Sequence, residues 1–137
     1  MQSDEALPIS IKGIVGPPGA VVLLRNERAE WELPGGRLEL TDPNPEACLR
    51  REIHEELEIE VSAGSPVHAW RYEPVPGRMV FLVAYRCESV GPWPTALTHS
   101  SEHVDVCVMP IEQALQHPEL PLGYRNALRR FAVGASG

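Results

Sequence analysis

The chain has 137 residues, of which 43% are hydrophobic, and this length and composition suit a single globular domain with one sizeable core. Its formal net charge of -7 excludes nucleic-acid binding through a broad basic surface, although a small phosphate-bearing molecule could bind through metal ions and local arginines. Cys48, Cys87 and Cys107 form neither a paired zinc-ligand pattern nor a disulfide framework. The sequence shows no secretory signal and no membrane span, so we expect a cytoplasmic protein.

The domain is expected to cover residues 9–133, after a flexible N-terminus at 1–8 and before a short tail at 134–137. No internal repeat or linker divides it.

The first half of the chain predicts short strands separated by turns. Residues 9–15 and 20–25 are apolar runs on either side of Gly16-Pro17-Pro18-Gly19, a pattern that predicts an opening hairpin. A third strand is expected at residues 31–33, directly before Pro34-Gly35-Gly36.

A helix is predicted from Pro45 to about Leu57. Asn44 can cap its first turn, proline suits the first helical position, and Glu46 favours the positive end of the helix dipole. Its apolar stripe recurs every four residues, as Leu49, Ile53 and Leu57.

The second half predicts further strands followed by two helices. Residues 67–72, 79–87 and 103–109 are β-rich and are expected to join one mixed sheet. Residues 111–116 and 123–133 are expected to close the chain as helices.

Three glutamates on the first predicted helix form the most informative pattern. Glu52, Glu55 and Glu56 stand at positions i, i+3 and i+4 and would share one helix face. Like charges at this spacing weaken a helix, so either water solvates the stripe or a cation neutralises it. Hard divalent ions such as Mg²⁺ take carboxylate oxygens.

These residues resemble the signature of the Nudix hydrolases. That signature is a glycine, five residues, a glutamate, seven residues, then Arg-Glu-apolar-x-Glu-Glu-x-Gly-apolar. Leu-Pro-Gly-Gly-Arg stands upstream at 33–37, and the matching positions are Gly36, Arg51, Glu52, Ile53, Glu55, Glu56 and Ile59. The resemblance implies an α/β fold, an α/β/α sandwich with a mixed β-sheet.

Two positions depart from the family pattern. Asp42 stands where the family has glutamate, and eight residues rather than seven separate it from Arg51, so the loop is one residue longer. Glu58 stands where the family has glycine, near a helix end that often needs a left-handed backbone. Keeping that turn with glutamate is expected to cost roughly 1 kcal/mol.

The resemblance implies a role for each matching residue. Glu52, Glu55 and Glu56 would bind Mg²⁺, or Mn²⁺ in its place, together with the Gly36 carbonyl. Arg51 would orient Glu52 or the loop acids Glu39 and Asp42, because its guanidinium stays protonated.

The family places the general base either within the signature or in a later loop. Glu102, directly before the predicted strand at 103–109, is the candidate in the later loop, and Glu55 is the candidate within the signature. Asp105 is a weaker substitute. The alternative reading of Glu102 is a solvated loop acid.

Other conspicuous side chains have a simpler structural explanation. His54 is expected to be an exposed helix residue, and Cys48 a small packing residue. Trp31 is expected to pack beside the Gly-Gly turn. Trp70 and Tyr72 share a strand face and are expected to belong to the core rather than to stack on a nucleobase.

The resemblance therefore implies a Mg²⁺-dependent pyrophosphohydrolase that cleaves a nucleoside diphosphate linked to another group. ADP-ribose-like compounds, nucleoside triphosphates and dinucleoside polyphosphates all remain candidate substrates. Long nucleic acids and membranes are not expected partners, and a homodimer is compatible by analogy with the family. The alternatives are a Nudix-like nucleotide-binding or regulatory domain without useful catalysis, and a solvated helix face without a site.

Overall fold

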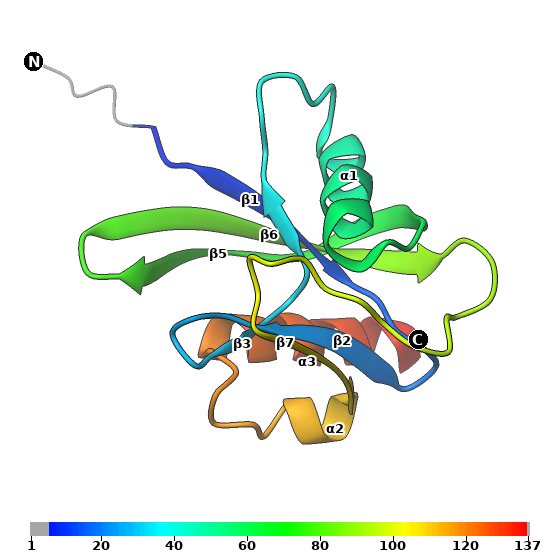
Figure 1. Ribbon diagram of the computed structural model, residues 1–137. Helices are drawn as coiled ribbons and strands as arrows, with labels where there is room; N and C mark the ends of the chain where they lie inside the picture. Colours follow the sequence, from blue (N-terminus) through cyan, green and yellow to red (C-terminus); the bar gives the residue numbers. More distant parts are fainter. Residues whose placement is uncertain (1–5, 137) are drawn as a thin grey trace, which may run out of the picture.

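Two β-sheets form the centre of the computed structural model, which describes residues 6–136 (Figure 1). The larger sheet has the order β4 (Gly35–Arg37), β1 (Ile9–Ile14), β6 (Arg78–Ser89), β5 (Val61–Val75). It is mixed, because β1 runs parallel to β6 while the other neighbours are antiparallel. Residues 1–5 of the expected flexible N-terminus and residue 137 of the expected tail lie outside the described residues.

The smaller sheet is antiparallel and has the order β3 (Trp31–Glu32), β2 (Ala20–Arg25), β7 (Asp105–Pro110). The strands therefore form two sheets rather than one, and the predicted hairpin of β1 and β2 is wrong. Most residues of both strands are buried, so each strand suits the interior of a sheet. An apolar run of this kind does not identify its neighbour.

Helix α1 (Pro45–Leu57) begins and ends at the predicted residues. The side chain of Asn44 accepts a hydrogen bond of 2.8 Å from the amide of Ala47, and proline occupies the start of the helix. The stripe of Leu49, Ile53 and Leu57 is buried. This stripe attaches the helix to the larger sheet.

Glu58 caps the C-terminal end of α1 with a left-handed backbone, at φ 56°. Its amide donates a hydrogen bond of 2.9 Å to the carbonyl of His54. The helix thus keeps the turn that usually favours glycine, although glutamate occupies it.

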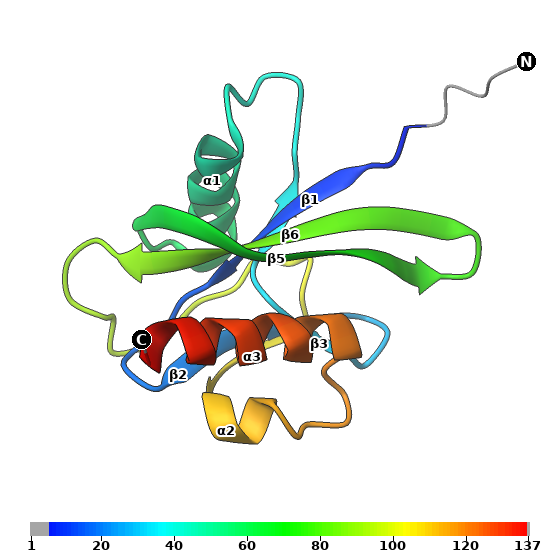
Figure 2. The same cartoon turned by 180° about the vertical axis from the view of Figure 1, so that it is seen from behind.

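The two long helices cover opposite faces of the larger sheet, as Figures 1 and 2 show. Helix α1 packs in a core with Ile11 and Tyr85, whereas α3 (Leu122–Ser136) packs in a second core with Leu82 and Ala84. The short helix α2 (Ile111–Ala114) follows β7 directly. This arrangement confirms the expected α/β sandwich with a mixed sheet, and α3 continues past the expected helix end at Val133 to Ser136.

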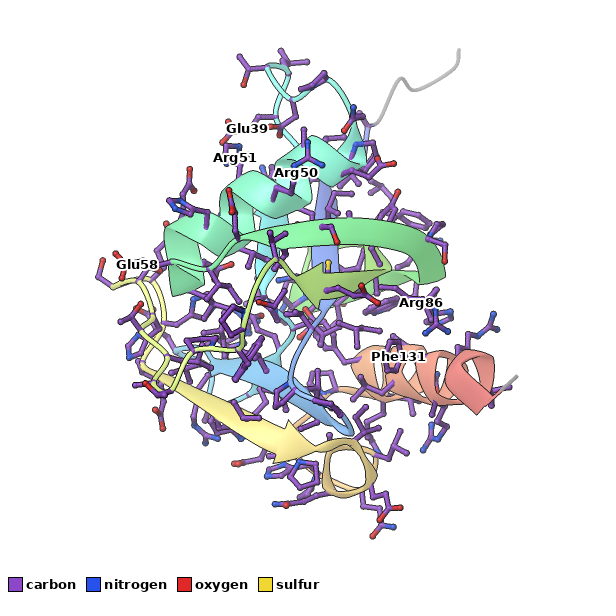
Figure 3. All side chains as sticks on the ribbon, turned by 90° about the vertical axis from the view of Figure 1, so that its right-hand side faces the viewer. Glu39, Arg50, Arg51, Glu58, Arg86 and Phe131 are labelled. Carbon is purple, nitrogen blue, oxygen red and sulfur yellow. The ribbon has the colours of Figure 1, made fainter. Side chains whose placement is uncertain are left out.

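A cation-π contact joins α3 to β6 near the end of the chain. The guanidinium of Arg86 lies 4.6 Å from the centre of the Phe131 ring and donates a hydrogen bond of 3.2 Å to the Phe131 carbonyl. Figure 3 shows both residues on the far side of the molecule from Arg51. No helix among residues 6–136 is long and apolar enough to cross a bilayer.

Strand β5 is longer than the predicted segment at 67–72. It pairs with β6 from Val61 to Val75, and its register shifts on both sides of Pro66 and again between Tyr72 and Val75. The sequence argued against a long strand there because it contains Gly64, Pro66 and Pro74. The bulges accommodate these residues by leaving some positions out of the hydrogen-bonded ladder.

Candidate active site

An open cleft of about 500 Å³ lies between α1, β4 and the segment that precedes β7. It brings together all six side chains or backbone groups that the sequence nominated for chemistry: Gly36, Arg51, Glu52, Glu55, Glu56 and Glu102. Asp105, the weaker candidate for the base, is not among the residues that line it.

Arg51 lies at the solvent-facing end of this carboxylate cluster. Its guanidinium is 2.8 Å from Asp42, 2.9 Å from Glu52, 3.6 Å from Glu55 and 3.8 Å from Glu39. Figure 3 shows Glu39 and Arg51 close together beside α1, with Glu58 at the C-terminal end of that helix. The expected contacts of Arg51 with Glu52 and both loop acids are therefore present.

Asp42 ties the longer loop to this arginine. One carboxylate oxygen accepts hydrogen bonds from the Glu39 amide and from Arg51, both of 2.8 Å, and the other accepts one of 3.1 Å from Arg51. The hydrogen bonds from Arg51 lower the pKa of Asp42 to about 2. Aspartate thus occupies the place of the family's glutamate and is held as an anion by Arg51.

Glu52 lies directly over Gly36. A Cβ atom added to Gly36 would collide with the Glu52 carboxylate, so only glycine leaves room for it. Burial raises the pKa of Glu52 above its ordinary value, despite the hydrogen bond from Arg51. The carbonyl of Gly36 is 3.8 Å from the Cys48 thiol, a weak donor, and Gly36 pairs with Ile11 in the β1–β4 ladder; a carbonyl oxygen has a second lone pair that can coordinate.

Glu56 is buried, with 3% of its area exposed, so it does not belong to a solvated helix face. One oxygen accepts a hydrogen bond of 2.9 Å from the Gly35 amide. The other, Oε2, lies 3.0 Å from Nδ1 of His103 but is not aligned with it as a hydrogen bond and has no hydrogen-bond partner. A buried carboxylate oxygen without a partner is suited to a cation.

His103 joins Glu56 to a second, partly buried carboxylate. Its Nε2 lies 2.7 Å from Oε1 of Glu32, whose other oxygen accepts a hydrogen bond of 3.3 Å from Asn26. Burial lowers the pKa of His103, but the contacts with Glu32 and Glu56 outweigh burial and raise it to about 9. At neutral pH the ring is therefore a cation with an N–H at each nitrogen.

Lys12 adds a positive charge beside this group. It is 8% exposed, on β1. Burial would raise the pKa of Glu32, but the charge of Lys12 and the hydrogen bond with His103 hold it at about 2. The positive charges of His103 and Lys12 thus compensate the negative charges of Glu32 and Glu56.

Sequence reasoning did not identify Glu32, His103, Lys12 or Asn26 as parts of the site. Glu32 and His103 are separated by 71 positions, and their pairing depends on how two sheets meet. The sequence contained one local signal for Glu32. This charged residue stands between the apolar Trp31 and Leu33, in the short strand that precedes Pro34.

Among residues 6–136, no three His, Cys, Asp or Glu side chains are gathered closely enough to enclose a metal ion as they stand. Arg51 engages Glu52 and Glu55, while Glu56 faces Gly35 and His103. The donors nevertheless fit a hard divalent cation, because three carboxylates line one cleft and Glu56 Oε2 is buried without a hydrogen bond.

The simpler explanations hold for the other conspicuous side chains. His54 is exposed, and Trp31 is buried in the core beside α3. Burial raises the pKa of the Cys48 thiol to about 12, so it is not an activated nucleophile. Trp70 and Tyr72 both make edge-to-face contacts with Tyr124, with ring centres 5.3 and 6.0 Å apart.

Comparison with known proteins agrees with this fold. The family model of the NUDIX domain matches residues 9–131, and the chain therefore belongs to the Nudix family. Similar structures include an ADP-ribose pyrophosphatase from Streptococcus suis, which is 19% identical. Membership of the Nudix family supports an enzyme that hydrolyses pyrophosphate bonds. No curated protein matches the sequence.

Solved structures similar to this one span nearly the whole chain. The E. coli ORF135 protein is 28% identical, with a TM-score of 0.74, over 95% of this chain and 91% of that one. The MutT protein from Methanosarcina mazei Go1 is 22% identical, with a TM-score of 0.82, over 99% and 100%. A C. elegans Ap4A hydrolase is 17% identical, with a TM-score of 0.79, over 96% and 99%.

Proposed function

We propose that the protein is a Mg²⁺-dependent pyrophosphohydrolase, able to use Mn²⁺, that cleaves the diphosphate bond of a nucleoside diphosphate linked to another group. The observation that carries this proposal is that Glu56, although only 3% exposed, lines the same cleft as Glu52, Glu55 and Glu102. A merely solvated stripe would have no reason to bury one of its carboxylates.

Glu52, Glu55 and Glu56 are the proposed metal ligands, with the Gly36 carbonyl as a fourth. When bound, a divalent cation neutralises the oxygens of the diphosphate and lowers the pKa of water. Arg51 keeps Glu52 oriented through its contact of 2.9 Å and restrains Asp42 at the same time.

Glu102 is the proposed general base. It is exposed at the cleft and stands in a turn, where its carboxylate can accept a proton from the attacking water. Glu55, with 58% of its side chain exposed, is the candidate base on α1 itself. Both candidate bases line the cleft that contains the proposed metal ligands.

The substrate is proposed to be a small nucleotide-like molecule: an ADP-ribose-like compound, a nucleoside triphosphate or a dinucleoside polyphosphate. The excess of acidic residues around the cleft disfavours a long nucleic acid. The free thiols of Cys48, Cys87 and Cys107 fit a cytoplasmic enzyme. A homodimer is also proposed by analogy with the family, and sedimentation analysis would detect it.

A hydrolysis screen of these three substrate classes, with and without Mg²⁺ and with the products identified, tests the proposal. We expect turnover only with a divalent ion, giving a nucleoside monophosphate and a phosphorylated remainder. Glu56→Gln and Glu52→Gln are expected to lower kcat by orders of magnitude while the circular dichroism of the fold persists.

Glu60→Gln is the matched control, because Glu60 is an exposed acid that does not line the cleft. It should behave as the wild type. Nucleotide binding without metal-dependent turnover would instead support the non-catalytic binding domain. Wild-type activity in both Glu56→Gln and Glu52→Gln would rule out the proposed ligands.

A further inference from the structure

In space, the segment at 98–104 lies between the C-terminal end of α1 and the smaller sheet. Hydrogen bonds hold it at both ends. The Thr98 hydroxyl shares its one hydrogen between the Glu58 carboxylate, at 3.1 Å, and the Leu57 carbonyl, at 3.4 Å. At the other end the Val104 amide donates one of 3.0 Å to the Arg25 carbonyl. Between these anchors, Glu102 lines the cleft.

His103 is the one side chain of this segment that reaches two carboxylates from different elements, the buried Glu56 and the partly buried Glu32. It contacts Glu32 on β3 at 2.7 Å and Glu56 on α1 at 3.0 Å, and only 10% of its side chain is exposed. The second oxygen of each carboxylate is held separately, by Asn26 and by the Gly35 amide. The ring therefore lies between two carboxylates that are already fixed.

Such a bridge restrains the residue next to it. Moving His103 away would leave one oxygen of Glu32 and one of Glu56 without their polar neighbour in a largely buried place, which is unfavourable. Glu102 is joined to His103 by one peptide bond, so its backbone position follows from that of the histidine. A general base depends on placement to within a fraction of an ångström.

We propose that His103 is a positioning residue that fixes both Glu56 and the backbone of Glu102 in the cleft by bridging Glu32 to Glu56. The inference rests on the proposed hydrolase function. It adds to that function a role for His103 and Glu32, two residues that do not belong to the signature. His103 itself takes no part in bond cleavage.

The test replaces His103 with phenylalanine, which keeps a ring but removes both polar contacts, and with glutamine, which can restore one of them. His99→Phe is the matched control, because His99 lies in the same segment, is exposed and contacts only the neighbouring Ser100 carbonyl in the structure. We expect His103→Phe to lower kcat about 10- to 100-fold with little change in KM. His103→Gln should recover part of this loss.

Two measurements need no turnover. Mn²⁺ titration of the substrate-free protein, followed by electron paramagnetic resonance, should show weaker binding in His103→Phe, because Glu56 keeps its hydrogen bond from the Gly35 amide but loses the contact that fixes its Oε2. Hydrogen exchange at the amides of 98–104 should be faster than in the wild type, whereas the amides of α3 should keep their protection. His99→Phe should match the wild type in both measurements.

The outcomes separate the two proposals. If the wild type shows no metal-dependent turnover, the hydrolase proposal fails whatever His103 does. If the wild type is active and His103→Phe keeps wild-type kcat, Mn²⁺ binding and exchange at 98–104, the positioning role is overturned. If His103→Phe does not fold, the folded His103→Gln is compared with the wild type, and equality in these three readouts again overturns it.

Discussion

The carboxylate cluster has two ends, and the same kinds of charge are exposed at one and buried at the other. At the Arg51 end, 29% of the arginine side chain and 56% of Glu39 are exposed. At the His103 end the corresponding values are 10% for the histidine and 3% for Glu56. Water screens the first set of pairs, whereas the second set has little water to replace a lost partner.

This difference teaches that distance alone does not rank the contacts of the site. Arg51 is as close to Asp42 as His103 is to Glu32, within about 0.1 Å. Both carboxylates are largely shielded, so the contrast lies in Arg51, which is 29% exposed, and His103, which is 10% exposed. Removing a charge at the Arg51 end is therefore expected to cost little stability. Removing one at the His103 end is expected to cost much more.

The sharpest way to break this comparison is to remove one acid at each end. Glu32→Gln removes an anion between His103 and Lys12 and is expected to lower the free energy of unfolding by about 3 kcal/mol. Glu39→Gln, at the exposed end, should lower it by less than about 1 kcal/mol. Urea unfolding of both variants measures the contrast, and similar losses would show that burial does not distinguish the ends.

Gly36→Ala probes the carboxylate that lies between the two ends. The added methyl group would collide with the carboxylate of Glu52 and displace it. We expect kcat to fall about 10- to 100-fold, as for the loss of a group that orients a ligand. Gly64→Ala is the control, because its methyl group would meet its nearest neighbour at an ordinary 3.4 Å. Unchanged kcat in Gly36→Ala would mean that the position of Glu52 is not critical.

Asp42→Asn tests the Arg51 end of the cluster through its dependence on pH. The pKa of Asp42 is lowered to about 2 from an ordinary value of 3.8, so ionised Asp42 contributes stability fully above about pH 4. That contribution is lost as the pH falls from 4 towards 2. The difference in thermal midpoint between wild type and Asp42→Asn should therefore shrink over this range, and a constant difference would contradict the role of the charge.

The smallest effect is expected from Glu58→Gly. Glycine adopts the left-handed turn without a Cβ penalty, so the free energy of unfolding should rise by up to about 1 kcal/mol. The variant also loses the contact with Thr98, so amides near 98 should exchange faster despite the higher stability. Chemical unfolding and hydrogen exchange together separate the two effects, and a fall in stability would show that the contact outweighs the strain.

The sequence was sufficient for the parts of the fold and site that depend on local spacing. Asn44, Pro45 and the stripe through Ile53 located α1 correctly, because capping and helical periodicity act within a few residues. The same spacing placed Glu52, Glu55 and Glu56 together, and the structure brings them to one cleft with Glu102.

What the sequence missed depends on contacts between distant segments. The pairing of β1 with β6 rather than β2, and the contact of His103 with Glu32, are set by how the sheets meet. β4 was missed because glycines at 35 and 36 indicate a turn, although its backbone pairs with β1. In both cases the partner segment, not the local sequence, decides the structure.

The interrupted pairing of β5 also bears on how this protein avoids association with other strands. β5 lies at the edge of the larger sheet, where a long regular strand would offer a row of free amides and carbonyls to another chain. Pro66 and Pro74 have no amide hydrogen to offer, and the three shifts in register break the repeat that an incoming strand would need. Pro66 and Pro74, which lie outside the strand predicted at 67–72, thus make this edge a poor template for another strand.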